Sequence, residues 1–120
     1  MIKKVFNTKE EWLEARKCTI GSSEAAACDG KSKWMSTDDL YNKVALGKVK
    51  TIPENDRMKV GTKAEKLIRS LFALDTQERY KIKNPPRNKY WLFYAEDNHM
   101  LTCSPDGFLI DKLNKDNFGL

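Results

Sequence analysis

Histidine and cysteine are scarce in this chain of 120 residues. His99 is the only histidine, and Cys18, Cys28 and Cys103 are widely separated. No two cysteines have the spacing of a zinc knuckle, which argues against a zinc site. A single histidine without a serine–histidine context also argues against a catalytic triad. We therefore expect three reduced thiols, as in a cytosolic protein.

Long apolar runs are also missing. No run approaches the roughly 18 residues that a membrane helix needs, and residues 1–6 are too polar for a signal peptide. We expect no membrane association and a cytoplasmic location. The composition, 40% hydrophobic and 32% charged residues, is that of one globular domain. The net charge of +5 makes nucleic acid a reasonable partner, because basic side chains neutralise phosphates.

The first part of the sequence, residues 1–76, predicts helices. Three short helices are expected at residues 8–17, 25–28 and 36–47. Thr8 and Glu11 have the spacing of a capping box. Ser36 opens the third helix, and Gly30 and Gly47 end the second and third because glycine readily adopts a left-handed conformation.

The longest helix is expected from about Asn55 to Leu74. At 100° per residue, one arc of this helix is apolar and the opposite arc is basic or polar. The apolar arc contains Val60, Ala64, Leu67, Ile68, Leu71 and Phe72, and the polar arc contains Lys59, Lys63, Lys66 and Ser70. Glu65 departs from this pattern, because it lies at the edge of the inward-facing side.

After residue 76 the pattern changes to short strands. They are expected at residues 80–83, 90–94, 99–103 and 108–110, with a loop at 85–88 and turns at 105–107 and 114–117. Residues 118–120 resemble the start of a further strand, although a polar hairpin with a loose tail is the alternative. The predicted class is α+β, with N-terminal helices packed on a mixed, mainly antiparallel sheet. We expect a single partial domain over residues 1–120, helical at 1–76 and an antiparallel strand meander at 77–120.

Asp106 is the first candidate for chemistry. An aspartate between Pro105 and Gly107 can be an ordinary turn residue. However, strands are expected on both sides of it, and a carboxylate at a strand end is well placed to bind Mg²⁺.

Glu65 is the second candidate. It could be an exposed glutamate paired with Arg69 four residues later. Its place beside the apolar arc argues against full exposure, and a carboxylate there needs a partner. A metal ion, or water bound to one, would serve.

The third candidate is the Gly21-Ser22-Ser23 segment. Ser22 and Ser23 supply hydroxyls and free backbone N–H groups that suit a phosphate. Arg16 lies just upstream and could hold the same phosphate with two hydrogen bonds. The alternative is an ordinary serine cap.

Four sequence blocks together resemble a known family. They are WLEAR at 12–16, IGSSE at 20–24, GTKAE at 61–65 and TCSPDG at 102–107. In this order they are similar to the successive signatures of the YqaJ-type viral recombinases, the lambda exonuclease family within the PD-(D/E)XK nuclease superfamily. Each block alone is weakly specific, whereas four in order are fairly specific.

The resemblance implies a restriction-endonuclease-like core and Mg²⁺-dependent (or Mn²⁺-dependent) hydrolysis of DNA, usually as an exonuclease on duplex ends. It implies a metal site at Asp106 and Glu65, and a terminal-phosphate site at Arg16 and Ser23, with Ser22 beside it. It also implies a phage or prophage protein in a bacterial host, working in recombination beside a single-strand annealing protein.

One departure from the family pattern concerns the second half of the active site. The family continues after a Gly-Leu-like pair with Glu-x-Lys, whereas Gly119-Leu120 ends this sequence. Without those groups Mg²⁺ should bind weakly and no lysine would stabilise developing charge. We expect an incomplete core and an inactive or nearly inactive nuclease. Exposed C-terminal strands should favour self-association.

The alternative function is a non-catalytic module that binds DNA ends or another protein. It would keep the phosphate site and the basic residues of the long helix without chemistry. A structural fragment with no activity is a third possibility.

Overall fold

In the computed structural model the chain forms two compact units, each built from two segments. Unit 1 comprises Met1–Lys50 and Pro85–Pro105, and unit 2 comprises Thr51–Asn84 and Asp106–Leu120. The structure describes residues 1–114 and 117–119, and the side chains of residues 1–114. Helices and a mixed set of strands are both present, so the predicted α+β class is confirmed.

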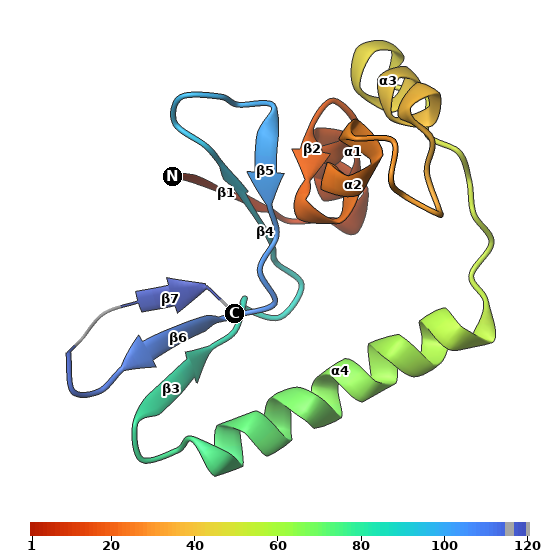
Figure 1. Ribbon diagram of the computed structural model, residues 1–120. Helices are drawn as coiled ribbons and strands as arrows, with labels where there is room; N and C mark the ends of the chain where they lie inside the picture. The colour runs from red at the N-terminus through yellow and green to blue at the C-terminus, as the bar shows by residue number, and fades with distance from the viewer. Residues whose placement is uncertain (115–116, 120) are drawn as a thin grey trace. The chain divides into compact units, whose positions relative to one another are not determined.

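Unit 1 contains a four-stranded sheet of order β1-β4-β5-β2. β1 (Ile2–Phe6) pairs antiparallel with β4 (Tyr90–Tyr94), and β4 pairs antiparallel with β5 (Leu101–Cys103). The short β2 (Ile20–Gly21) pairs parallel with β5 (Figure 1). The sheet is therefore mixed and mainly antiparallel, as expected from the sequence.

The core of unit 1 is centred on β4. Trp91, Leu92 and Phe93 are buried, and Leu92 is completely inaccessible to solvent. Ala27 and Leu40 are the other buried apolar residues, one from each of two helices. Burial of these side chains is the main favourable term that stabilises the folded unit.

The helix α1 (Lys9–Lys17) begins where the sequence predicts. The Thr8 hydroxyl accepts a hydrogen bond from the Glu11 N–H at 3.2 Å. The Glu11 carboxylate accepts from the Asn7 N–H rather than from Thr8, so only half of the predicted capping box forms. The Trp12 indole N–H donates to the Trp91 carbonyl at 3.2 Å, which ties α1 to β4.

The next two helices also match their predicted ends. A 3-10 turn (Ser22–Glu24) leads directly into α2 (Ala25–Cys28), which is followed by Gly30 in the left-handed region. α3 (Thr37–Leu46) ends at Gly47, whose φ is 65°. The Ser36 and Asp39 side chains form a complete capping box at the start of α3.

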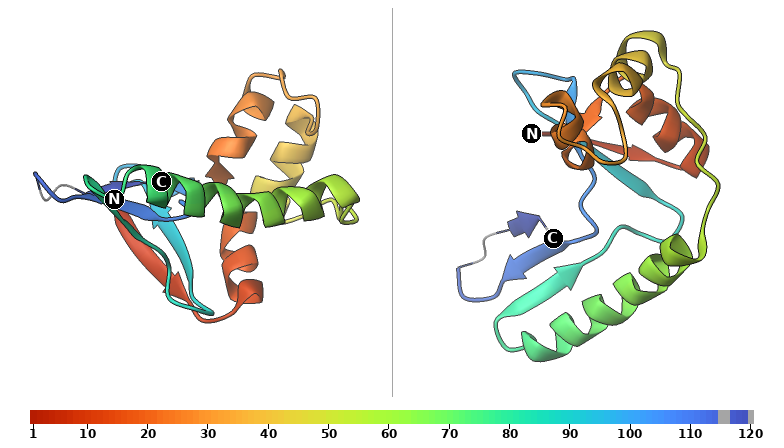
Figure 2. Two further views of the ribbon diagram at one scale, coloured as in Figure 1. Left: turned by 90° about the horizontal axis from the view of Figure 1, so that it is seen from below. Right: turned by 45° about the vertical axis from the view of Figure 1, so that its right-hand side comes forward.

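Unit 2 consists of one long helix and a three-stranded sheet. α4 (Asp56–Asp75) is capped by Asn55 and is followed by β3 (Tyr80–Lys83), which turns back beside it (Figures 1 and 2). β6 (Phe108–Asp111) pairs antiparallel with β3 and with β7 (Asn117–Gly119). β7 confirms that a strand follows the second turn. Residues 115–116 of that turn, and Leu120, lie outside the described residues.

Three predictions about the strands were wrong. Residues 1–76 are not purely helical, because β1 and β2 are strands; both depend on pairing with segments far along the chain, which local periodicity does not reveal. The strands do not form a meander, because β3 pairs with β6 instead of β4. β5 begins at Leu101 and not at His99, since the Asn98 carbonyl and side chain accept hydrogen bonds from Leu101 and Met100 in a turn.

The predicted inward face of α4 is exposed. Val60, Leu67, Ile68 and Leu71 are between 57% and 64% exposed, and no described residue of α4 is buried. Only a small sheet accompanies this helix within unit 2. The amphipathic pattern is present in the sequence, but the described part of unit 2 does not cover the apolar arc.

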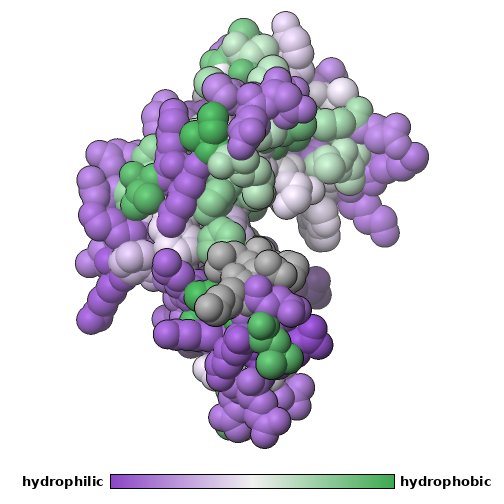
Figure 3. Space-filling view, turned by 90° about the vertical axis from the view of Figure 1, so that its left-hand side faces the viewer, coloured by the Kyte–Doolittle hydropathy of each residue, from purple (hydrophilic) through white to green (hydrophobic). Residues whose placement is uncertain are grey.

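Several large hydrophobic side chains, including several of the α4 apolar arc, are exposed among the described residues. On the face shown in Figure 3, hydrophilic side chains predominate, and hydrophobic ones gather mainly in the upper part of the view. Among the described residues, no helix combines the length and the apolar character needed to cross a membrane.

Candidate functional site

Asp106 lies directly before β6, at the point where the chain enters unit 2 for the second time. The next residue, Gly107, is buried against the end of β3. A Cβ atom at Gly107 would lie 3.2 Å from the Asn84 side-chain oxygen and 3.4 Å from the Lys83 carbonyl oxygen. A glycine therefore allows this close approach, and the preceding carboxylate is left exposed at the strand end.

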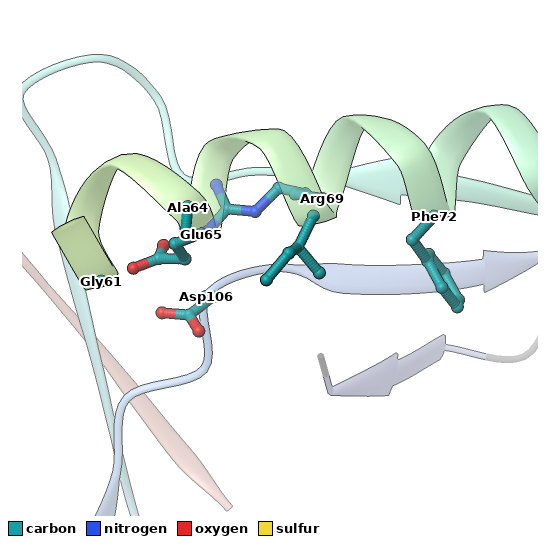
Figure 4. A pocket seen from close by; sticks show the side chains of 7 residues that line it. Gly61, Ala64, Glu65, Arg69, Phe72 and Asp106 are labelled. Atoms are coloured by element: carbon teal, nitrogen blue, oxygen red, sulfur yellow. The ribbon is translucent and has the colours of Figure 1, made fainter.

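Asp106 and Glu65 line the same pocket of unit 2. The pocket has a volume of about 460 Å³ and is lined by Gly61, Ala64, Glu65, Ile68, Arg69, Phe72 and Asp106. Figure 4 shows the carboxylates of Glu65, from α4, and Asp106, from the loop before β6, close together on the same side of the pocket. The two residues are far apart in the sequence, so the fold of unit 2 brings them together.

Glu65 already has a partner. Its carboxylate forms an ion pair with the Arg69 guanidinium at 2.6 Å, one helical turn further along α4. The Glu65 side chain is 46% exposed and that of Arg69 is 22% exposed. The simple i,i+4 pairing considered from the sequence therefore does form, and any cation in this pocket would share Glu65 with Arg69.

The donors in the pocket suit a hard divalent cation only in part. Carboxylate oxygens are the ligands that Mg²⁺ prefers, and it commonly uses one or two of them with retained water. However, no group of three or more His, Cys, Asp or Glu side chains that could hold a metal occurs among the residues the structure describes. The chemistry of Glu65 and Asp106 fits Mg²⁺ or Mn²⁺, but as a minimal ligand set.

The candidate phosphate residues lie together in unit 1. The Arg16 guanidinium stacks over the Trp12 ring, with 4.6 Å between its central carbon and the ring centroid. A Cβ atom at Gly21 would lie 3.8 Å from an Arg16 nitrogen, so the guanidinium reaches the start of the Ser22–Glu24 turn. Ser22 and Ser23 are exposed, and Arg16 forms no ion pair within the described part of the chain. These residues could therefore present a cation and two hydroxyls to one phosphate.

Two charged residues that the sequence analysis did not single out support this segment. The Glu24 carboxylate accepts a hydrogen bond from the Gly21 N–H at 2.8 Å and forms an ion pair with Lys43 at 2.6 Å. Both side chains are largely buried. The available signal was the Gly21–Glu24 spacing, which matches the second half of a capping box. The partner Lys43 could be found only from the packing of α3.

Asp111 is another buried carboxylate that the sequence did not indicate. It accepts hydrogen bonds from the Leu113 N–H at 2.9 Å and the Asn114 N–H at 3.4 Å, and Arg79 lies 3.6 Å away. The Leu113 hydrogen bond is the largest cause that lowers the pKa of Asp111, with the Asn114 bond and Arg79 adding to it against desolvation. Its role is to hold the turn after β6.

The candidate residues thus form two clusters, Glu65 with Asp106 in unit 2 and Arg16 with Ser22 and Ser23 in unit 1. In a comparison with known protein families, residues 11–120 of this chain match the YqaJ-like viral recombinase domain. No curated protein and no solved structure matches the chain.

Proposed function

This chain belongs to the YqaJ-like viral recombinase family, and on that premise we propose a phage-type DNA nuclease domain that hydrolyses phosphodiester bonds with Mg²⁺ or Mn²⁺. The observation that carries the proposal is the shared pocket of Glu65 and Asp106. Family members act in recombination, so duplex DNA ends are the proposed substrate, in the cytoplasm of a bacterial host and beside a single-strand annealing protein.

The candidate residues divide into two groups with different proposed roles. Asp106 and Glu65 would hold the metal, and a bound metal would polarise the phosphoryl oxygen and activate water. Glu65 is kept in place by Arg69, whose guanidinium also adds positive charge to the pocket. Arg16, Ser22 and Ser23 would bind the terminal phosphate and so fix which DNA end is held.

The 120-residue polypeptide by itself should cleave DNA slowly or not at all. The pocket offers two carboxylates, one of them shared with Arg69, and no cluster of three metal-binding side chains occurs among the described residues. Two ligands bind Mg²⁺ weakly, and no lysine among the residues that the structure describes lines the pocket to stabilise developing charge. Rapid Mg²⁺-dependent degradation of linear duplex DNA by this purified polypeptide would refute the expectation.

The phosphate cluster favours a second candidate function, a module that binds DNA ends without cleaving them. In contrast to the minimal metal pair, this cluster combines two exposed hydroxyls with an arginine that forms no ion pair among the described residues. Binding of DNA without cleavage, in the presence of Mg²⁺, would favour this function over the enzyme.

The phosphate site can be tested by end-dependent binding. The chain should bind a short blunt duplex with 5′-phosphates more tightly than the same duplex with 5′-hydroxyls, measured by fluorescence anisotropy. Arg16→Ala should remove most of that preference. Lys17→Ala is the matched control, because Lys17 is the next residue of α1 and pairs with Glu14. Equal losses in both variants, or no preference in the unmodified chain, would reject a specific phosphate site.

Self-association through the C-terminal strands also belongs to this proposal. β7 is an edge strand of the unit 2 sheet, and edge strands can pair with other chains. Analytical ultracentrifugation should show concentration-dependent association, and a monomer at high concentration would reject it.

A further inference from the structure

Lys43 is a buried lysine in the middle of α3. Only 7% of the residue is exposed, and its ammonium group donates hydrogen bonds to the Glu24 carboxylate and the Thr19 carbonyl, both at 2.6 Å. Burying an ion pair is costly unless its remaining hydrogen bonds are satisfied, and stability alone seldom favours such a pair over apolar residues. The groups that Lys43 binds therefore indicate why this lysine is buried.

Lys43 and Glu24 together hold both ends of the short segment from Thr19 to Glu24. Lys43 binds the carbonyl of Thr19, just before β2, and the carboxylate of Glu24, just after Ser23. The second oxygen of Glu24 accepts the Gly21 N–H at 2.8 Å. On the other side, Ile20 and Gly21 pair with β5. The backbone that carries Ser22 and Ser23 is thus fixed from α3 as well as from the sheet.

The pair also controls the charge beside Arg16. A Cβ atom at Gly21 would lie 3.7 Å from the Glu24 carboxylate and 3.8 Å from an Arg16 nitrogen, so both groups approach the same point. A carboxylate there would repel a phosphate and would compete with it for Arg16. Lys43 is the cation that binds Glu24 in the structure, and this leaves Arg16 without a carboxylate partner in the described residues.

We propose that Glu24 and Lys43 are positioning residues for a DNA-end phosphate: Glu24 orders the Gly21–Ser23 backbone, and Lys43 neutralises Glu24 so that Arg16 stays available. This inference rests on the proposed phosphate site of Arg16, Ser22 and Ser23. It adds two residues that do not touch the phosphate but act through those that do.

Three variants separate this role from simple stabilisation. Lys43→Met leaves the Glu24 carboxylate without its cation, and should reduce the preference for 5′-phosphate over 5′-hydroxyl duplex ends about tenfold, the effect of one uncompensated like charge near a bound phosphate. Glu24→Gln can still accept the Gly21 N–H but carries no charge, so the preference should be kept or increased. The double variant should recover most of what Lys43→Met loses.

The measurements are end preference by fluorescence anisotropy and thermal stability on the same samples. A purely structural role predicts that both single variants lose stability and end preference together. The proposed role predicts a lower end preference in Lys43→Met, an equal or higher one in Glu24→Gln, and an unchanged one in Lys43→Arg, which keeps the charge. If Lys43→Met does not fold, Glu24→Gln and the double variant still decide, because a loss of preference in both would overturn the proposal.

The same measurements distinguish failure of the proposed phosphate site from failure of the role of Glu24 and Lys43. If the unmodified chain shows no preference for 5′-phosphate ends, the phosphate site is absent and the inference falls with it. If that preference is present and Lys43→Met folds with the same preference, only the role of Glu24 and Lys43 is overturned.

Discussion

We predict that Arg69 weakens the binding of a divalent cation in the proposed metal pocket. Its guanidinium pairs with Glu65 at 2.6 Å and lines the same pocket as Asp106. A bound Mg²⁺ or Mn²⁺ would have to share Glu65 with this positive charge. Arg69→Ala should therefore raise the affinity of the pocket for a divalent cation.

The size of this effect follows from the charges and their exposure. Removing one unit charge from a few ångströms away changes the interaction energy by about 1 kcal/mol in water and by about 4 kcal/mol at a protein surface. Glu65 is 46% exposed, so solvent screens much of this interaction. We expect a gain of about 1–2 kcal/mol, or roughly 5- to 30-fold in affinity.

Titration with Mn²⁺, followed by electron paramagnetic resonance, measures this affinity directly. Lys66→Ala is the matched control, because it also removes one positive charge from α4 but does not line the pocket. Arg69→Lys should bind the metal much as the unmodified chain does. Weaker binding in Arg69→Ala, or equal gains in Arg69→Ala and Lys66→Ala, would refute the reasoning.

Three predictions concern stability. Leu92→Ala removes a completely buried side chain from the unit 1 core and should cost about 2–5 kcal/mol in urea denaturation followed by tryptophan fluorescence; a cost below about 1 kcal/mol would contradict the assigned core. Gly47→Ala places a side chain at a φ of 65° with open space around it, so its cost, about 1 kcal/mol, should come from the backbone alone, and an unchanged melting temperature would argue against this end of α3. Because the pKa of Asp111 is lowered in the folded chain, its contribution is complete above the unfolded carboxyl pKa of about 3.9 and is lost as pH falls through the lower folded value. Asp111→Asn should therefore reduce the fall in stability below about pH 4, measured by denaturation between about pH 3 and pH 7, and an unchanged acid profile would exclude this role.

Local signals in the sequence predicted the helices well. Capping side chains and glycines mark helix ends through contacts between near neighbours, and Thr8, Ser36 and Gly47 all occupy the predicted positions. The strand pairing was not predictable in the same way, because β1 and β2 acquire their hydrogen-bond partners from distant segments. The expected single domain stays a prediction, and within it the chain divides into two compact units.

The candidate site was predictable to a different extent in each unit. Glu65 was predicted as a candidate because it lies at the edge of the apolar arc, and it does line a pocket with Asp106. The metal and phosphate roles of these residues stay predictions. Glu24 and Lys43 were not identified, because a lysine in an ordinary helical pattern gives no sign of burial until α3 is packed.

The most direct test of the central claim is whether Glu65 and Asp106 bind one divalent cation together. Mn²⁺ titration should show weak, saturable binding to the unmodified chain and its loss in Asp106→Ala and in Glu65→Gln. Asp75→Ala, which removes an α4 carboxylate outside the pocket, should bind as the unmodified chain does. Binding that is unchanged in Asp106→Ala and Glu65→Gln would contradict the claim that this pocket is the metal site.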